Sequence, residues 1–102
     1  MKIIGIGKNY VVDKAEIKTI KNGKQLIFLK AESTLVTDNK DVVYPSITNE
    51  LAYEVELVIK IGKKGKHISL ANAGSYISEI AVGIDYTAKD VLAQSRANKG
   101  PW

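Results

Sequence analysis

Residues 51–61 carry the clearest alternation of apolar and polar positions in the chain. The odd-numbered positions form an apolar row of Leu51, Tyr53, Val55, Leu57, Ile59 and Ile61. The even-numbered positions are mixed and include two glutamates. Because successive side chains of a β-strand point to opposite faces, this period of two predicts a strand with one apolar face.

Shorter apolar runs predict three more strands. They lie at residues 2–7, 25–30 and 79–86. Residues 42–45 are expected to be a short extended segment that stops at Pro45, since proline cannot donate to a sheet ladder. The chain is therefore expected to be rich in strands.

Three helices are expected between these strands. Asp13 and Glu16 have capping-box spacing at the start of the first helix. Ser69 is positioned to cap a helix that reaches about residue 77. Thr87 and Asp90 have capping-box spacing at the start of a helix that ends before Gly100 and Pro101. Strands mixed with short helices predict an α+β fold that is mainly β.

The composition is that of one small globular domain. The chain has 102 residues, of which 45% are hydrophobic and 25% charged. It contains no cysteine, which excludes a disulfide framework and a thiolate metal site. No apolar run approaches the ~20 residues of a membrane helix, and the first residues become polar too early for a signal peptide. We expect a cytoplasmic protein.

A formal net charge of +4 raises the question of nucleic-acid binding. Arg96 is the only arginine, whereas nucleic-acid surfaces favour arginine for its planar fork. The stretch "KIGKKGKH" (60–67) could be a basic patch, but it lacks interleaved aromatic residues and also fits a solvated turn. Nucleic-acid binding is therefore the third-ranked hypothesis. His67, the only histidine, is expected on the surface.

Glu54 and Glu56 lie on one face of their predicted strand, with Cα atoms ~6.6 Å apart. Two carboxylates on one face repel each other unless a positive group lies between them. Spacing alone favours a solvated outer face, with Lys60 next along it. Asp85, at the end of another predicted strand, adds a third carboxylate, and such a set would suit a hard cation such as Mg²⁺ or Mn²⁺.

Four stretches carry a resemblance to a known family. They are "KIIGIGKNYVVDKAEI", "IFLKAESTLV", "YEVELVIKIGKKGKHIS" and "AVGIDYTAKDVLAQSRANKGPW". In order and spacing the chain resembles the fumarylacetoacetate hydrolase family, in particular its small single-domain acylpyruvate hydrolases and oxaloacetate decarboxylases. The resemblance implies a mixed β-roll, a divalent metal ion, Mg²⁺ or Mn²⁺, and a homodimer.

The resemblance also assigns roles to residues. It implies metal binding by Glu54, Glu56 and Asp85, a catalytic pair at the positions of Asp13 and Glu16, and substrate binding by Lys8, Lys30 and Lys89. A 2-oxo acid would chelate the metal, which stabilises the enolate formed when a C–C bond breaks or CO₂ leaves. The implied function is hydrolysis of acylpyruvates or decarboxylation of oxaloacetate.

Several positions depart from the family pattern. The family histidine falls on Asp13, and lysines stand at two arginine positions, Lys8 and Lys89; Leu92 replaces a glutamine. Aspartate is a weaker base than histidine near neutral pH, and lysine lacks the bidentate grip of arginine. These changes weaken the case for water-activating hydrolysis more than for decarboxylation or tautomerisation.

Members of the family continue well beyond the stretch that resembles residues 1–102. We therefore expect a partial catalytic domain, corresponding to the N-terminal half and inactive by itself. A second hypothesis is a non-catalytic member that keeps the fold and the metal site. A sheet cut in this way exposes an edge and an apolar face, so the chain is expected to dimerise, aggregate or associate with the missing half.

Overall fold

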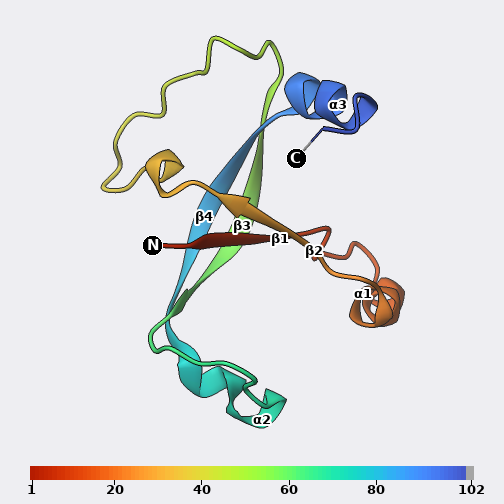
Figure 1. Ribbon diagram of the computed structural model, residues 1–102, viewed down its shortest axis with the longest axis vertical. Coiled ribbons are helices and arrows are strands. Elements are labelled where there is room, and N and C mark those ends of the chain that lie inside the picture. The colour runs from red at the N-terminus through yellow and green to blue at the C-terminus, as the bar shows by residue number, and fades with distance from the viewer. Residues whose placement is uncertain (101–102) are drawn as a thin grey trace. The chain divides into compact units, whose positions relative to one another are not determined.

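The computed structural model describes residues 1–100 and divides into two compact units, residues 1–43 and 44–100. Each unit contains one antiparallel pair of strands together with short helices (Figure 1). The fold is therefore α+β and mainly β, as the sequence predicts.

The first unit is built on a short hairpin-like pair. β1 (Ile3–Gly7) pairs antiparallel with β2 (Leu26–Lys30), so both predicted strands are confirmed. Gly5 faces Phe28 across the pair, and a Cβ atom on Gly5 would lie 2.2 Å from Cζ of the Phe28 ring. Glycine at this position is required for the ring to lie across β1.

The helix between β1 and β2 begins with a capping box. Asp13 is the N-cap of the 3-10 helix η1 (Lys14–Glu16), which continues into α1 (Ile17–Asn22). The Ala15 amide donates to Asp13 Oδ1 at 2.8 Å. In return, Glu16 Oε2 accepts from the amides of Val12 and Asp13 at 3.2 and 3.5 Å. The start predicted from the Asp13–Glu16 spacing is confirmed.

The second unit is built on a long hairpin. β3 (Leu51–Ile61) pairs antiparallel with β4 (Ile77–Ala88), and a register shift follows Lys60. The connection holds α2 (Leu70–Ala73) and the 3-10 helix η3 (Gly74–Tyr76), and α3 (Lys89–Ala97) follows β4. Figure 1 shows α2 and α3 at opposite ends of the hairpin.

One predicted capping box is absent from the structure. Thr87 belongs to β4, the N-cap of α3 is Ala88 without a side-chain cap, and so the predicted Thr87–Asp90 capping box is wrong. Ser69 stands at the N-cap of α2 as predicted, although its side chain makes no capping bond, and η3 continues the helical segment to Tyr76. Residues 42–45 form neither strand nor helix.

Apolar side chains are poorly covered throughout the described residues. Within residues 1–100 no hydrophobic side chain is buried, and the one buried polar residue is Thr48, which is 4% exposed. Each strand pair shows the reason, because a two-stranded sheet has two faces and too little neighbouring chain to cover them. Neither unit has a closed hydrophobic core among these residues.

Candidate metal and substrate site

The register of β3 and β4 brings the three predicted carboxylates onto one face. Glu54 lies directly opposite Asp85, and Glu56 lies opposite Gly83, the next position on the same face. Directly opposed residues of an antiparallel pair have Cβ atoms about 4.5–5.5 Å apart. Glu56 and Asp85 are half-buried. Acidic groups this close repel each other, so the arrangement favours a nearby positive charge.

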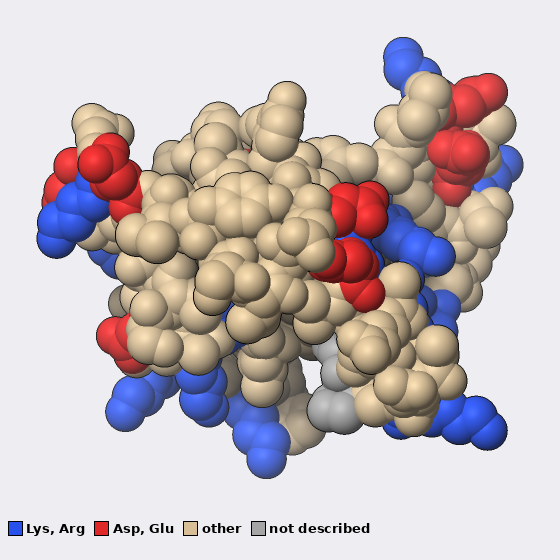
Figure 2. Space-filling view, turned by 90° about the horizontal axis from the view of Figure 1, so that it is seen from above, with Lys and Arg blue, Asp and Glu red and all other residues tan. Residues whose placement is uncertain are grey.

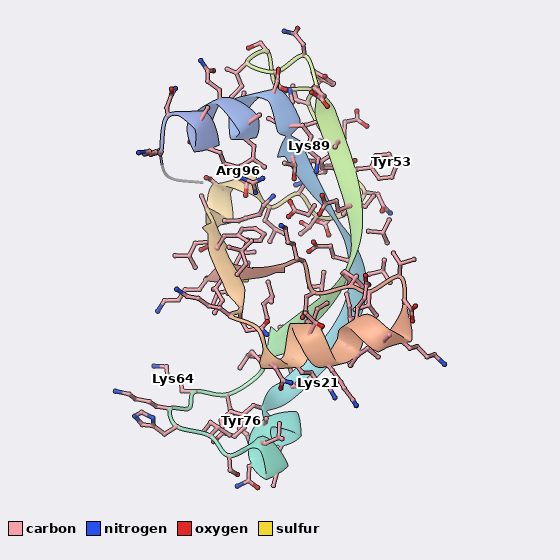
Figure 3. The ribbon with its side chains drawn as sticks, turned by 90° about the vertical axis from the view of Figure 1, so that its right-hand side faces the viewer. Lys21, Tyr53, Lys64, Tyr76, Lys89 and Arg96 are labelled. Carbon is pink, nitrogen blue, oxygen red and sulfur yellow. The ribbon has the colours of Figure 1, made fainter. Side chains whose placement is uncertain are left out.

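The apolar row lies on the opposite face of the same hairpin. Tyr53 faces Tyr86, and Val55 faces Ile84. These apolar positions alternate with the glutamates along β3, so their side chains point to the other face. Figure 3 shows Tyr53 pointing outward from β3. The separation into a carboxylate face and an apolar face therefore follows the alternation of the sequence.

Lys89 supplies a positive charge to the carboxylate face. Its Nζ donates to Glu54 Oε1 at 3.0 Å, with both side chains about half exposed. Its backbone amide donates to the carbonyl of Glu50 at 2.8 Å, just before β3 begins. Lys89 stands where β4 passes into α3 (Figure 3). Backbone and side chain of one residue thus join the start of α3 to the first part of β3.

Asp90 reinforces this junction. Its carboxylate accepts hydrogen bonds from the Thr48 hydroxyl and, at 2.9 Å, from the amides of Asn49 and Val91. The hydrogen bond from Thr48, with that from Asn49, lowers the pKa of Asp90 below its ordinary value. Asp90 therefore clamps the segment before β3 onto the first turn of α3, next to Lys89.

The three carboxylates suit a hard divalent cation both in ligand type and in their shared face of the hairpin. Carboxylate oxygens are the ligands that Mg²⁺ and Mn²⁺ prefer, and Glu54, Glu56 and Asp85 share a face. Among residues 1–100, however, no three acidic or histidine side chains are arranged closely enough to surround an ion. Glu54 is hydrogen-bonded to Lys89 instead. Metal binding by the three carboxylates remains a prediction.

In the first unit, Lys8 and Glu16 border one open hollow. Its volume is about 450 Å³, and its lining is completed by Tyr10, Thr19 and Ile20. Lys8 has a left-handed backbone, with φ at 54°, which is uncommon for a residue other than glycine and turns the chain after β1. An ammonium, a phenol and a carboxylate thus border one hollow of the first unit.

The other two predicted residues of the first unit lie elsewhere. Asp13 is outside the lining of the hollow and binds the backbone of its own helix. Lys30 is half-buried at the end of β2, opposite Ile3. The structure thus brings together Lys8 with Glu16, and Lys89 with Glu54.

Sequence reasoning missed two contributors to these sites. Tyr10 lines the hollow and lies within the family-like stretch "KIIGIGKNYVVDKAEI", which is the available signal. The clamp between Thr48 and Asp90 joins residues 42 positions apart, and no local spacing indicates it.

In the lysine-rich connection after β3, a lysine lies over an aromatic ring. Lys63 lies over the Tyr76 ring with Nζ 4.4 Å from its centroid, and His67 is exposed as predicted. Figure 2 shows the lysine and arginine side chains in blue and the acidic ones in red. Among the described residues, no helix is long and apolar enough to cross a membrane.

Comparison with known proteins places these residues in a family. A model of the fumarylacetoacetate hydrolase C-terminal domain matches residues 2–102. An oxaloacetate tautomerase from Arabidopsis thaliana, named as mitochondrial, is 32% identical over 99% of this chain and 45% of its own length. A bifunctional isomerase/decarboxylase of homoprotocatechuate catabolism from Escherichia coli is 36% identical over 88% of this chain and 21% of its own.

A solved structure has the same fold over the whole chain. It is a crystal structure described as a candidate fumarylpyruvate hydrolase from Burkholderia cenocepacia, with a TM-score of 0.88 and 31% identity. The match covers 100% of this chain and 43% of that one. Several of the curated relatives are thus about twice as long as this chain.

Proposed function

We propose a function from the premise that this chain belongs to the fumarylacetoacetate hydrolase family, as the match over residues 2–102 shows. The chain is part of a divalent-metal-dependent enzyme that acts on 2-oxo acids at a C–C bond or the adjacent enolisable position. The names of the relatives, oxaloacetate tautomerase and isomerase/decarboxylase, support this substrate class.

One observation carries the proposal. Glu54 and Asp85 are directly paired across the hairpin, and Glu56 is next to them on the same face. Three carboxylates on one face, with a lysine already attracted to one of them, form an anionic site that suits Mg²⁺ or Mn²⁺. When bound there, such an ion would act as a Lewis acid on the keto oxygen of the substrate and stabilise an enolate.

The lysines of this chain would bind the anionic part of the substrate. Lys89 lies beside Glu54 and would pair with a substrate carboxylate once Glu54 engages the cation. Lys8 and Lys30 are proposed to contribute positive charge for the same purpose. Each lysine offers a compact point charge, so substrate orientation is looser than with the planar fork of arginine.

The contacts of Asp13 favour tautomerisation or decarboxylation over hydrolysis. Its carboxylate accepts a hydrogen bond from the Ala15 amide, and Glu16 accepts from the Val12 amide in the same capping box. Both groups are therefore engaged with the backbone. Aspartate is also a weaker base than histidine near neutral pH, so activation of a water is less favoured here, whereas decarboxylation asks less of a base.

The complete activity is proposed to belong to an assembly larger than this chain. The chain spans less than half of several of its curated relatives, so by itself it is expected to be inactive. The family resemblance further suggests a homodimer.

Oxaloacetate and acylpyruvate turnover test the proposal in a protein that contains this chain and the remainder of the family domain. We expect Mg²⁺- or Mn²⁺-dependent tautomerisation or decarboxylation of oxaloacetate, and loss of it in Glu56→Gln. Asp13→His should raise acylpyruvate hydrolysis and change oxaloacetate decarboxylation little. Turnover that does not depend on metal in either the wild type or Glu56→Gln would contradict the proposal.

A second candidate is a non-catalytic member that keeps the fold and the metal site. The capping role of Asp13 favours it, because a structural task fully accounts for that carboxylate. The same experiment separates the two candidates. A non-catalytic member would bind Mn²⁺ through Glu56 but show no turnover of either substrate, with or without Asp13→His.

A further inference from the structure

The turn between α1 and β2 contains the only asparagine of the sequence that is followed directly by glycine, Asn22 before Gly23. Asn22 is the last residue of α1, and Gly23 is its C-cap in an extended conformation, with φ at −80° and ψ at 166°. Asn22 is exposed, and among residues 1–100 no hydrogen bond engages its side-chain amide. That amide is therefore free to meet the backbone nitrogen that follows it.

Glycine at position 23 is required by the turn. A Cβ atom there would lie 2.9 Å from the backbone carbonyl oxygen of Thr19, closer than such atoms normally come. A larger residue would thus force the end of α1 to shift. Because glycine has no side chain, nothing shields the backbone nitrogen that Asn22 faces.

The end of α1 is held weakly. The helix has six residues, and none of them is buried. Helices this short are marginal in water unless they are packed against other elements. The Gly23 amide donates to the Ile20 carbonyl at 3.3 Å, which is longer than the usual value of about 2.9–3.0 Å. This last turn can therefore open without disturbing a packed core, and opening brings the Asn22 side chain within reach of the Gly23 nitrogen.

We propose that Asn22 is a deamidation site at which the backbone nitrogen of Gly23 is the attacking group and water the co-reactant. The nitrogen loses its proton to hydroxide and bonds to Cγ of Asn22. The bond from Cγ to the side-chain nitrogen breaks, and that nitrogen takes up a proton and leaves as ammonia. Water then adds to either carbonyl of the resulting succinimide ring, which opens to aspartate or isoaspartate. No atom is oxidised or reduced.

The reaction changes both charge and backbone at the turn. Either product has a carboxylate at the C-terminal end of α1, where the helix dipole disfavours negative charge. Isoaspartate also routes the chain through the former side chain, which lengthens the backbone between α1 and β2. Gly23 and Lys8 line the same open hollow, with a volume of about 190 Å³. Deamidation thus alters a surface beside Lys8, while its own chemistry does not depend on the enzymatic activity.

Asn98 provides an internal comparison. It is exposed and is the C-cap of α3, so that it lies at a helix end as Asn22 does. The residue after it is Lys99, whose side chain hinders attack by the backbone nitrogen. We expect Asn22 to react and Asn98 to persist.

The experiment incubates the 102-residue chain at mildly alkaline pH and then cleaves it after glutamate. Mass spectrometry should show conversion of an amide to an acid in fragment 17–32 and none in fragment 80–102, which contains Asn98. An isoaspartyl methyltransferase should methylate fragment 17–32, and ammonia should appear in an amount equal to the conversion. Conversion should quicken as pH rises, because the Gly23 nitrogen must lose its proton. Asn22→Gln should abolish all of these changes.

The other outcomes overturn the proposal. An unchanged fragment 17–32 in the native chain, even where unfolding in urea allows conversion, would show that the end of α1 protects Asn22. A mass change that persists in Asn22→Gln would assign the reaction to Gln25. Aspartate without isoaspartate would indicate direct hydrolysis and exclude attack by Gly23. Equal conversion of Asn98 would show that the following glycine gives no selectivity.

Discussion

Lys89 Nζ donates to Glu54 Oε1 at 3.0 Å, across a sequence separation of 35 residues. The bond connects the first residue of α3 with the carboxylate that faces Asp85 across the hairpin. A cation entering the carboxylate face must compete with this ammonium for the same oxygen. The strength of that competition can be measured.

Removal of the Lys89 ammonium should strengthen metal binding. In Lys89→Met the carboxylate of Glu54 loses its internal partner, and the site loses a repelling positive charge. Exposed ion pairs contribute about 0.2–1 kcal/mol, which corresponds to roughly a 1.5- to 5-fold rise in Mn²⁺ affinity. The affinity is measured from the electron paramagnetic resonance signal of free Mn²⁺.

Lys60→Met is the matched control for this experiment. Lys60 lies on the same face of β3 but pairs with Glu79, at the far end of the hairpin. Its loss should leave Mn²⁺ affinity unchanged. An equal rise in both variants would reflect net charge alone and contradict competition at Glu54.

Asp13 should stabilise the start of its helix. Replacement by alanine removes the acceptor for the Ala15 amide, and loss of an N-cap acceptor costs about 1 kcal/mol. Hydrogen exchange at the amides of residues 17–22 should therefore quicken about fivefold in Asp13→Ala. Asp13→Asn keeps a capping oxygen and should exchange like the wild type. Fast exchange in both variants would mean that the negative charge, not the cap, matters.

The clamp at Asp90 should weaken in acid. Its folded-state pKa lies below the ordinary value of 3.8, because Thr48 and Asn49 donate to the ionised carboxylate. A depressed pKa means that the contribution to stability is fully present above the ordinary value and is lost as pH falls through the lower, folded-state value.

Nuclear magnetic resonance can follow this change at the amide of Asn49. Its chemical shift should titrate together with the Asp90 carboxyl carbon, at a pH below 3.8. Asp90→Asn should abolish the titration of the Asn49 amide. A midpoint at or above 3.8 in the wild type would show that Asn49 and Thr48 do not hold the ionised group.

The sequence predicts the strands well because strand patterning is local. The alternation of residues 51–61 predicts β3 with the bounds that the structure has, Leu51–Ile61. β4 is longer than its predicted 79–86, since pairing with β3 extends it beyond its most apolar part. Each strand has a local pattern of apolar residues that predicts it, and pairing with a neighbouring strand extends the strand beyond that pattern.

Helix starts and site contacts are less predictable because their partners are distant. Asp90 has capping-box spacing to Thr87, yet it binds Thr48 instead, 42 residues away. Likewise, the alternation places Glu54 on the polar side of β3, but only the register of the hairpin sets it opposite Asp85. Local rules cannot rank a near partner against a distant one.

The central claim is that Glu54, Glu56 and Asp85 bind one divalent cation. Mn²⁺ titration of the wild type and of Glu56→Gln tests it most directly, with Glu79→Gln as the matched control on the same face. Loss of an outer-shell partner costs roughly 10- to 100-fold in metal affinity, so loss of the ligand Glu56 should lower Mn²⁺ affinity by at least about 10-fold. Glu79→Gln should leave Mn²⁺ affinity unchanged. Equal Mn²⁺ binding by the wild type and Glu56→Gln would contradict the account.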